Sequence, residues 1–587
     1  MSHMKILFDI ESKVGNSKGD LISRTEDVFI IVTKNLDDNS VITHYNIEEG
    51  LRYLDCASEL IGHNIIGYDL PVLQRLYDYV PNARITDTLV MSRLVYPNRR
   101  ERDAIHRWKH LDTKLYGSHS LKAWGQRLDF AKGDYGQTED AWEKLSEAMV
   151  EYCIQDVELT HKLYGILKPK LQSRKALSLE QELTVICNRQ ERHGIPFDVD
   201  RAQHFYSELC GRRSELQTEL IDKFGWWYTG ELREPKTKPS YSKLIKVVFN
   251  PRSRQHIAKR LKDFYNWKPT EFTPSGEPKV DESVLSKLEY PEAKLLTEYL
   301  LVNKRISQLA EGDQAWLKLE RNGRIHGRVN TMGSVTSRCS HSHPNLAQIP
   351  SVSAPYGKEC RELFCAPEGF RFLGVDISGL ELRCLAHYMA LFDNGDYGKK
   401  LLEDDIHTVN QNAAGLSTRN QAKTFIYAFL YGAGDEKIGS IVGGSSEEGA
   451  KLKKRFLSQI PALEKLRNAV KKKAQKGYLK GLDGRRIPIR SDYGALNTLM
   501  QSAGAIICKR WVVEFNKLLT KRDFVDTIDY QQVAFVHDEL QLIVKDEHAD
   551  KIGETAVEAI QISGDKYGFR LPLTGEYKIG GSWAETH

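Results

Sequence analysis

Apolar residues change their spacing several times along the chain, and each change predicts a different kind of segment. The runs K-I-L-F-D-I and V-F-I-I-V-T near the N-terminus predict strands. Short apolar runs and helical patterns alternate after them, which predicts an α/β domain. A long helix is predicted over about 139–167, where Pro169 follows, and a second helical pattern runs to the H-G-I-P turn at 193–196. We therefore expect a domain boundary near residue 172.

The rest of the chain changes character twice. Residues 199–310 have a mainly helical pattern, interrupted between 226 and 246 by a loop that contains Pro and Lys. Beyond residue 323 strands and helices mix, with Gly-rich turns over 432–444. A length of 587 residues suggests roughly four domains at about 150 residues each. The pattern predicts a multidomain α/β and α+β protein and excludes a single small module.

Composition describes an ordinary globular protein but hides a local asymmetry of charge. The chain has 84 Lys and Arg against 79 Asp and Glu, a net charge of +5, with 41% hydrophobic residues. This composition excludes a disordered chain. Residues 451–490 hold 14 Lys and Arg but only Glu464 and Asp483, which makes them +12 and leaves −7 for the remainder. Local charge of this kind favours an anion-binding surface.

Cysteine usage and hydropathy indicate the cellular compartment in which the protein is expected to work. The nine Cys are scattered and form no C-x-x-C pair, which is typical of reduced thiols and not of a disulfide framework or a zinc knuckle. No run reaches the roughly 18 apolar residues of a membrane span, and no signal-peptide pattern is present. We expect a cytoplasmic protein without membrane contact.

A first group of acids lies in the N-terminal third. Asp9 and Glu11 are two apart on the first predicted strand, so their side chains share one face. Asp69 closes the segment H-N-x-x-x-Y-D, and Tyr152 and Asp156 are four apart on one helix. Four converging acids without Lys or Arg partners repel one another unless divalent cations neutralise them. The set therefore favours a two-metal phosphodiester hydrolase over an inactive nuclease fold.

A second group of acids lies far downstream. Asp376 ends a strand in G-V-D-I-S-G-L-E-L-R, while His537 and Asp538 separate two apolar strand runs. This pattern predicts a hairpin with acids at its tip. Each acid alone is typical of a turn residue. Together they present a carboxylate pair on neighbouring strands, suited to two Mg²⁺ ions in phosphoryl transfer.

A helical segment between these acids carries cations and aromatic residues at one spacing. Arg419, Lys423, Tyr427 and Tyr431 are four apart, and each step advances 40° around a helix, so they form one slowly turning stripe. Two cations followed by two aromatic rings match a nucleoside triphosphate lying along the helix. The alternative is a solvated basic face that grades into core aromatics.

The order of these motifs resembles that of a known family. The N-terminal set is similar to the three motifs of the DEDDy-type proofreading exonuclease, and the downstream set resembles motifs A, B and C of family A DNA polymerases. The segments 336–350, 405–408, 434–439 and 496–509 resemble the replicative polymerases of T-seven-type bacteriophages, and the likeness covers essentially the whole chain.

The resemblance implies a fold and a division of the chain. We expect an RNase H-like exonuclease domain followed by a right-hand polymerase domain with an antiparallel palm sheet. The implied segments are the exonuclease (1–172), thumb and connecting helices (173–318), first part of the palm (319–388), fingers (389–496) and second part of the palm (497–587).

The resemblance also implies residue roles. In the exonuclease site, Asp9, Glu11, Asp69 and Asp156 would hold two Mg²⁺ ions and Tyr152 would orient the attacking water. In the polymerase site, Asp376, Asp538 and the Ile377 carbonyl would hold two more, with Mn²⁺ as a substitute. The remaining roles are triphosphate binding by Arg419, Lys423 and His407, pyrophosphate protonation by Lys423, exclusion of the ribose 2′-hydroxyl by Glu381, sugar contact by Tyr427, and DNA contact by Arg338, Gln501, His537 and Tyr431.

The implied partners are primer–template DNA and dNTPs, with a replicative helicase-primase and a single-strand binding protein as further candidates. Lys471, Lys472 and Lys473 are candidates for contact with incoming template or an acidic helicase tail. In the phage relatives a long thumb insertion binds thioredoxin as a clamp. The corresponding stretch here, 226–248, is a short linker carrying Arg233, Lys236, Lys238, Lys243 and Lys246. A thioredoxin clamp is therefore doubtful, and we expect a monomer.

Three other interpretations follow from the same residues. An organellar or plasmid replicase of the family would share every motif, and in a phage the compartment would be the host cytoplasm. A non-catalytic DNA-binding descendant would have lost metal acids, yet all six are present. A stand-alone exonuclease is disfavoured because the polymerase motifs occupy most of the chain. The chain also begins at the exonuclease motif without a 5′-nuclease domain, which favours replication over repair.

Overall fold

The computed structural model describes residues 4–16, 19–130, 142–233 and 241–587. Contacts between Cα atoms divide the chain into two units. Unit 1 comprises residues 1–194, 327–348 and 366–587, and unit 2 comprises residues 195–326 and 349–365. Both groups of predicted acids therefore lie in unit 1. Among the described residues, no helix has the length and apolar character needed to cross a membrane.

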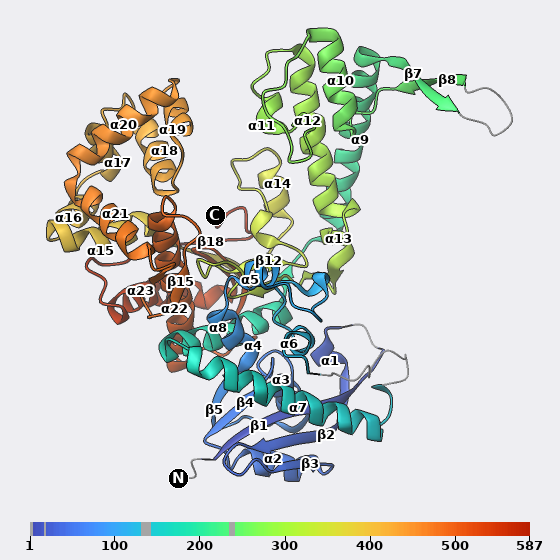
Figure 1. The fold of residues 1–587 in the computed structure, drawn as a ribbon, viewed down its shortest axis with the longest axis vertical. Coiled ribbons are helices and arrows are strands. Elements are labelled where there is room, and N and C mark those ends of the chain that lie inside the picture. The colour runs from blue at the N-terminus through green and yellow to red at the C-terminus, as the bar shows by residue number, and fades with distance from the viewer. Residues whose placement is uncertain (1–3, 17–18, 131–141, 234–240) are drawn as a thin grey trace. The chain divides into compact units, whose positions relative to one another are not determined.

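A mixed five-stranded sheet opens unit 1. Its strand order is β3-β2-β1-β4-β5, with β1, β2 and β3 antiparallel and β1, β4 and β5 parallel. Helix α7 lies along one face of this sheet (Figure 1). The elements are β1 (Lys5–Val14), α1 (Leu21–Arg24), β2 (Thr25–Asn35), β3 (Val41–His44), α2 (Ile47–Leu54), β4 (Glu59–Gly62), α3 (Asp69–Tyr77), β5 (Arg84–Asp87), α4 (Thr88–Val95), α5 (Arg99–His106), α6 (Leu121–Arg127), α7 (Glu147–Leu167) and α8 (Arg174–His193).

The predicted long helix is present but begins later than expected. Residues 139–141 lie outside the described residues, and α7 begins at Glu147. The Ser146 side chain accepts a hydrogen bond from the Met149 backbone N–H at 3.2 Å, which satisfies a donor of the first turn. The cap, and not the apolar pattern, sets this helix start.

A second, fully antiparallel sheet forms the centre of unit 1. Its order is β16-β17-β13-β18, and apolar residues of its strands pack with α15, α22 and α23 in one large core. The predicted hairpin is confirmed, since β16 and β17 pair directly and His537 and Asp538 form their turn. The elements are β11 (Arg328–Asn330), β12 (Ser340–Ser342), β13 (Phe370–Ile377), α15 (Leu380–Asp393), α22 (Ala495–Lys521), β16 (Tyr530–Val536), β17 (Glu539–Lys545), α23 (Ala549–Lys566) and β18 (Gly575–Gly580).

Six helices and a short hairpin form a helical lobe between α15 and α22. A capping box fixes the start of α18, because Thr418 and Gln421 each bond the other's backbone N–H. Ala422, Phe425 and Ile426 of this helix are buried in the core. The elements are α16 (Asp396–Glu403), α17 (Ile406–Ala414), α18 (Arg419–Leu430), α19 (Asp435–Ile441), α20 (Ser446–Gln459), α21 (Pro461–Ala474), β14 (Tyr478–Lys480) and β15 (Arg486–Pro488).

Unit 2 is mainly helical, as the pattern over 199–310 predicts. Its long helices α9 and α12 pack on each other. The predicted linker at 226–248 is instead an antiparallel ribbon of β7 and β8, which projects from the helices of this unit (Figure 1). The elements are β6 (Ile195–Pro196), α9 (Val199–Phe224), β7 (Trp226–Arg233), β8 (Tyr241–Val248), α10 (Arg254–Tyr265), α11 (Glu282–Leu285), α12 (Pro291–Ile306), α13 (Trp316–Leu319), β9 (Glu320–Arg321), β10 (Arg324–Ile325) and α14 (Gly357–Glu362).

The ribbon forms because residues 226–228 are all aromatic and residues 247–248 are both Val, and aromatic and β-branched side chains favour strands. Trp226 pairs with Val248, and the Lys246 ammonium lies 4.5 Å from the Trp226 ring centroid. Lys236 and Lys238 lie outside the described residues. The predicted fold class, α/β followed by a domain with an antiparallel sheet, is confirmed.

Candidate functional site

The first site lies along the middle of β1. Asp9 and Glu11 stand two apart on this strand, opposite Val32 and Ile30 of β2, and the register shifts directly after Glu11. Asp69, the first residue of α3, accepts a hydrogen bond from the Ile10 backbone N–H at 3.2 Å. That bond anchors the third acid to the backbone between the first two.

Helix α7 brings the remaining residues of this site to β1. Asp156 is buried, and Tyr152 lies one turn before it with its ring edge-on to Trp142 at 6.0 Å. Between them, Cys153 donates to Asp9 Oδ2 at 3.6 Å. Burial first, and then the charges of all four acids, raises the pKa of the Cys153 thiol. The thiol therefore marks the point on which the four predicted acids converge.

Electrostatics in this first site favour cation binding. Potential ligand atoms of Asp9, Glu11 and Cys153 lie within 4.8 Å of one another. Burial raises the pKa of Asp69 to about 7, with a smaller contribution from the charge of Asp87. A carboxylate that is hard to ionise among other acids is stabilised in its ionised form when a divalent cation binds beside it.

Two residues of this site were missed by sequence reasoning. Asp87 is buried and accepts hydrogen bonds from the backbone N–H groups of Asn64, Ile66 and Leu89, so it holds the loop before α3 in place. Its position at the end of β5, before a helix, is a cap signal that was available. Cys153 gave no signal, because its role depends on the contact between α7 and β1.

The second site lies at the end of the central sheet. Asp376 is on β13, and Asp538 is in the adjoining turn, where the Ile377 backbone N–H donates to the Asp538 carbonyl at 3.3 Å. Among the described residues, neither carboxylate forms an ion pair with Lys, Arg or His. Burial, followed by the charges of Asp538 and Glu539, raises the pKa of Asp376 to about 7. Burial, followed by the charge of Glu381, raises the pKa of Asp538 to about 6.

Glu539 is a further acid of this second site that sequence reasoning missed. It pairs with Asp376 across β13 and β17. Trp583 Nε1 donates to its Oε1 at 2.6 Å, and His587 Nδ1 lies 2.9 Å from its Oε2. The V-H-D-E segment contains this acid, but only the strand register shows that it stands beside Asp376.

Glu381, in the first turn of α15, contacts the residue that follows α18. The Tyr431 hydroxyl donates to Glu381 Oε1 at 3.0 Å, and Arg338 Nη2 lies 3.8 Å from the same oxygen. Glu381, Arg338, His537 and Asp538 line one pocket with Gly504 of α22. Gln501 is half-buried on α22, one turn before that pocket wall. The structure therefore gathers the predicted DNA-contact residues around the acid pair.

The stripe on α18 is confirmed as a partly exposed face. Arg419 and Lys423 are exposed, Tyr427 is half-buried, and Tyr431 follows the last residue of the helix. The charges of Glu381 and Asp538 contribute to raising the pKa of Tyr427, after burial. The aromatic end of the stripe is therefore close to the acids, while the cationic end lies up to about 18 Å further along the helix at 1.5 Å per residue.

The cationic end of α18 has its own local contacts. Arg419 is held by Asp405, with Nε–Oδ2 at 2.5 Å and Nη2–Oδ1 at 3.1 Å. The His407 ring lies 6.3 Å from the Tyr427 ring, and its Nδ1 is buried without a hydrogen-bond partner in the described part of the chain. Burial, with the charge of Arg419, lowers the pKa of His407. A neutral His407 with a free ring nitrogen is suited to a polar ligand.

An acid pair on a central antiparallel sheet, faced by a helix with a cationic and aromatic stripe, defines a nucleotidyl-transfer class of site. Residues 231–585 match the model of DNA polymerase family A. The chain belongs to this family.

Relatives support this assignment. The chain is 38% identical to the DNA-directed DNA polymerase of Escherichia phage T7, over 90% of this chain and 92% of that protein. It is 25% identical to DNA polymerase I of Aquifex aeolicus, over 94% and 92% of the two chains. The fold also matches the POL domain of Pol1 from M. smegmatis, solved in complex with DNA primer-template and dNTP. That match has a TM-score of 0.76 at 19% identity and covers 100% of this chain and 96% of the other.

Proposed function

We propose that the protein is a replicative, DNA-directed DNA polymerase of the phage type with a 3′–5′ proofreading exonuclease. The observation that carries the polymerase activity is the placement of Asp376 near the end of β13 and of Asp538 in the adjoining turn. The two segments are bonded through the Ile377 N–H, and they face the α18 stripe. The likeness to the T7 phage polymerase over most of both chains supports the replicative role.

The residues of the polymerase site fit divalent cations. Two carboxylates with raised pKa values and no cationic partner among the described residues are a donor set for Mg²⁺. Asp376, Asp538 and the Ile377 carbonyl would hold two Mg²⁺ ions, with Mn²⁺ as a substitute. The metals supply charge neutralisation for the primer 3′-oxygen and the leaving pyrophosphate.

The α18 stripe would bind the incoming dNTP. Arg419, Lys423 and His407 would contact its phosphates, with the positive charge supplied by Arg419 and Lys423. Lys423 would also donate a proton to the departing pyrophosphate. Arg419 would exchange its bidentate contact with Asp405 for a contact with a phosphate. Its planar guanidinium can form paired hydrogen bonds with either a carboxylate or a phosphate. Tyr427 would contact the sugar.

Glu381 would select deoxyribose by shape. Tyr431 and Arg338 both hold its Oε1, so its side chain has a fixed position beside the acid pair. A ribose 2′-hydroxyl would need the same space. Arg338 and Gln501 would contact minor-groove acceptors, which are present at every correct base pair and so report geometry without reading sequence. His537 would lie at the primer terminus, and Tyr431 would contact DNA.

The N-terminal site would remove mispaired primer ends. Asp9, Glu11, Asp69 and Asp156 would hold two Mg²⁺ ions, which supply a nucleophile from water. Tyr152 would orient that water. The convergence of the four acids on Cys153 supports this role.

The domain assignment follows from these roles. We infer an exonuclease over 1–172, a thumb with connecting helices over 173–318, a palm over 319–388 and 497–587, and fingers over 389–496. A helicase-primase and a single-strand binding protein are proposed partners of a monomer. The β7–β8 ribbon gives no support to a thioredoxin clamp.

Primer extension tests this function. The purified protein with Mg²⁺, a primed DNA template and four dNTPs should extend the primer to the end of the template. Omitting one dNTP should stop synthesis at the first position that requires it. Extension that ignores the template sequence, or none at all, would contradict the proposal.

A further inference from the structure

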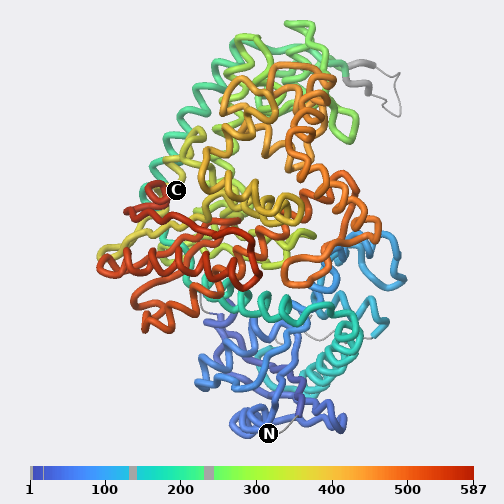
Figure 2. Tube along the Cα trace, turned by 90° about the vertical axis from the view of Figure 1, so that its left-hand side faces the viewer, coloured from blue at the N-terminus to red at the C-terminus, as the bar shows by residue number. Residues whose placement is uncertain are grey.

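A basic cavity lies in unit 1, away from both acid groups. Its volume is about 690 Å³, within the range of roughly 300–1,000 Å³ typical of ligand sites. One wall comes from the segment around α4, α5 and the start of α8, and the other from β14 and β15. Figure 2 shows the orange segment that carries β14 and β15 beside the blue segment that carries α5.

The cavity is cationic. Arg102 and Lys170 line the first wall, and Lys476 and Arg486 line the second; all four are exposed. None of the residues that line the cavity is an acid. Among the described residues, none of these four cations has a carboxylate within ion-pair distance. Four uncompensated charges around one cavity attract an anion and retain it.

Each wall also carries a tyrosine. Lys170 Nζ donates to the Tyr96 hydroxyl at 2.8 Å, and the Arg102 guanidinium carbon lies 5.4 Å from the Tyr96 ring centroid. On the other wall, the Arg486 guanidinium carbon lies 4.6 Å from the Tyr478 ring centroid. Tyr96 is buried, so the surfaces open to a ligand are the half-buried Tyr478 ring and the exposed guanidinium planes, and unpaired bases stack on surfaces of these two kinds.

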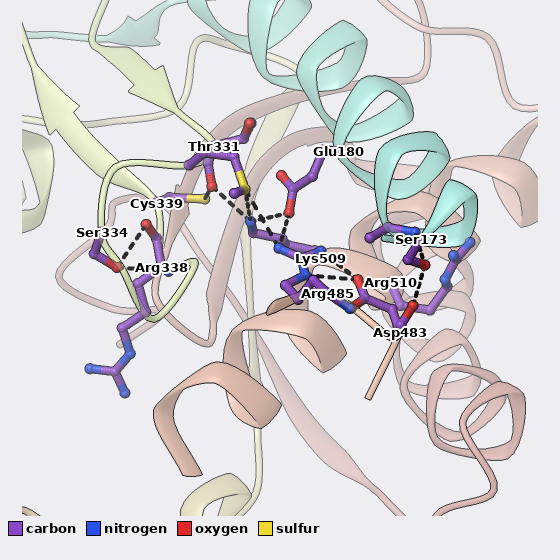
Figure 3. A network of polar contacts seen from close by, with 12 residues as sticks. Ser173, Glu180, Thr331, Ser334, Arg338, Cys339, Asp483, Arg485, Lys509 and Arg510 are labelled. Atoms are coloured by element: carbon purple, nitrogen blue, oxygen red, sulfur yellow. Dashed lines mark hydrogen bonds and ion pairs between the residues drawn. The ribbon is translucent and has the colours of Figure 1, made fainter. Parts of the chain in front are cut away.

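A buried network of ions fixes the two walls relative to each other (Figure 3). Arg485, from the turn between β14 and β15, contacts Asp483 and Glu180 at 2.5 Å each, and Lys509 contacts the same Glu180 at 2.6 Å. The Ser173 hydroxyl donates to the Asp483 carbonyl. Arg485 and Ser173 both line the cavity. The cavity is therefore preformed, and a ligand does not bear the cost of ordering it.

The charge of this network does not alter the charge of the cavity. Two cations, Arg485 and Lys509, face two anions, Glu180 and Asp483, so the network is neutral. The positive charge available to a ligand comes from the four exposed side chains alone.

We propose that this cavity binds unpaired nucleotides of single-stranded DNA, in the 5′ part of the template beyond the primer. Cations beside aromatic rings, with no acid, suit a phosphate backbone that carries exposed bases. An acidic peptide would use the cations but not the rings. The proposal rests on the proposed function, because it assumes that the protein works on primer–template DNA.

The test compares DNA affinity with and without a single-stranded template extension. One labelled primer–template has a 5′ overhang of about 20 nucleotides and the other about two, bracketing a site of 4–16 nucleotides. Affinities are measured by fluorescence anisotropy in EDTA, so that neither activity alters the DNA. Wild-type protein should bind the long overhang more tightly.

The informative variant is Lys476→Glu with Arg486→Glu. It should lose at least about tenfold in affinity for the long overhang, while the short overhang binds as before. The slope of log K against log salt concentration, measured with the long overhang, should become shallower by about 0.7 per lost phosphate contact. The matched control, Lys465→Glu with Arg467→Glu, makes the same charge change on α21 at exposed residues outside the cavity. It should keep the preference for the long overhang.

A second pair of variants tests stacking. Tyr478→Phe should keep the preference for the long overhang, and Tyr478→Ala should lose about fivefold. Equal preference in wild type and the Lys476→Glu, Arg486→Glu variant would overturn the proposal, as would an equal loss in the α21 control. If the Lys476→Glu, Arg486→Glu variant lost binding of poly-glutamate but kept its affinity for DNA, the cavity would belong to an acidic peptide. That result would also overturn the proposal. Failure of the wild type to bind either DNA would instead count against the proposed function.

Discussion

At the scale of single residues, the second site is defined by acids that share a small space. Sequence motifs predicted Asp376 and Asp538, because both stand at the ends of apolar strand runs. The same motifs could not show that Glu539 lies opposite Asp376, since strand register decides that pairing. The third acid matters chemically, because its charge contributes to raising the pKa of Asp376.

These raised pKa values predict how the metal requirement depends on pH. Asp376 and Asp538 have pKa values of about 7 and about 6, so protons compete with Mg²⁺ as the pH falls through this window. The half-saturating Mg²⁺ concentration for primer extension should rise by up to about tenfold per pH unit for each proton displaced. A requirement that stays constant between about pH 6 and pH 8 would show that the carboxyls are already ionised without metal.

Glu381 gives a prediction about sugar choice. Glu381→Ala should open the space beside the acid pair and raise ribonucleotide incorporation by about tenfold or more, the scale of one steric contact. Tyr431→Phe removes only the hydroxyl that donates to Glu381, so it should have a smaller effect in the same direction. The measurement is the ratio of kcat/KM for a dNTP and its ribonucleotide. An unchanged ratio in Glu381→Ala would remove Glu381 from this role.

At the scale of elements, the strands, the hairpin and the α18 stripe followed from periodicity, and the exceptions have local causes. Helix α7 begins at Glu147 because Ser146 caps it. The segment 226–248 contains Pro and Lys, which favour a loop, yet Trp226 and Val248 pair across a ribbon. Cross-strand pairing of this kind cannot be predicted from one strand alone.

The ion network predicts how α8 contributes to stability. Glu180 is fully buried between Arg485 and Lys509, so Glu180→Ala leaves two buried cations undercompensated. The free energy of unfolding should fall by about 3–5 kcal/mol. Glu182→Ala is the control on the same helix, because Glu182 pairs at the surface with Lys517 and should cost less than about 1 kcal/mol. Urea unfolding measures both; equal losses would contradict a structural role for the network.

The β7–β8 ribbon predicts independence from thioredoxin. Adding thioredoxin to primer extension on a long single-stranded template, with excess trap DNA, should leave product length unchanged. A several-fold increase in product length would show that this ribbon, or the segment that joins its strands, holds a clamp.

At the scale of the whole molecule, one chain carries two groups of acids on two separate sheets. The sequence predicted both groups and their order, because each is written in local motifs. It could not predict that α8, β14–β15 and α22 meet at one buried network, because Glu180, Arg485 and Lys509 are far apart in the chain. Long-range ionic contacts leave no periodic signal.

The central claim is that these two groups of acids are two independent active sites. The most direct measurement follows primer extension and degradation of a mispaired primer by the wild type, Asp376→Ala and Asp156→Ala. Asp376→Ala should abolish extension and retain degradation, whereas Asp156→Ala should retain extension and lose degradation, each loss being at least about a hundredfold. Loss of both activities in either variant, with the fold intact, would contradict the assignment of two separate sites.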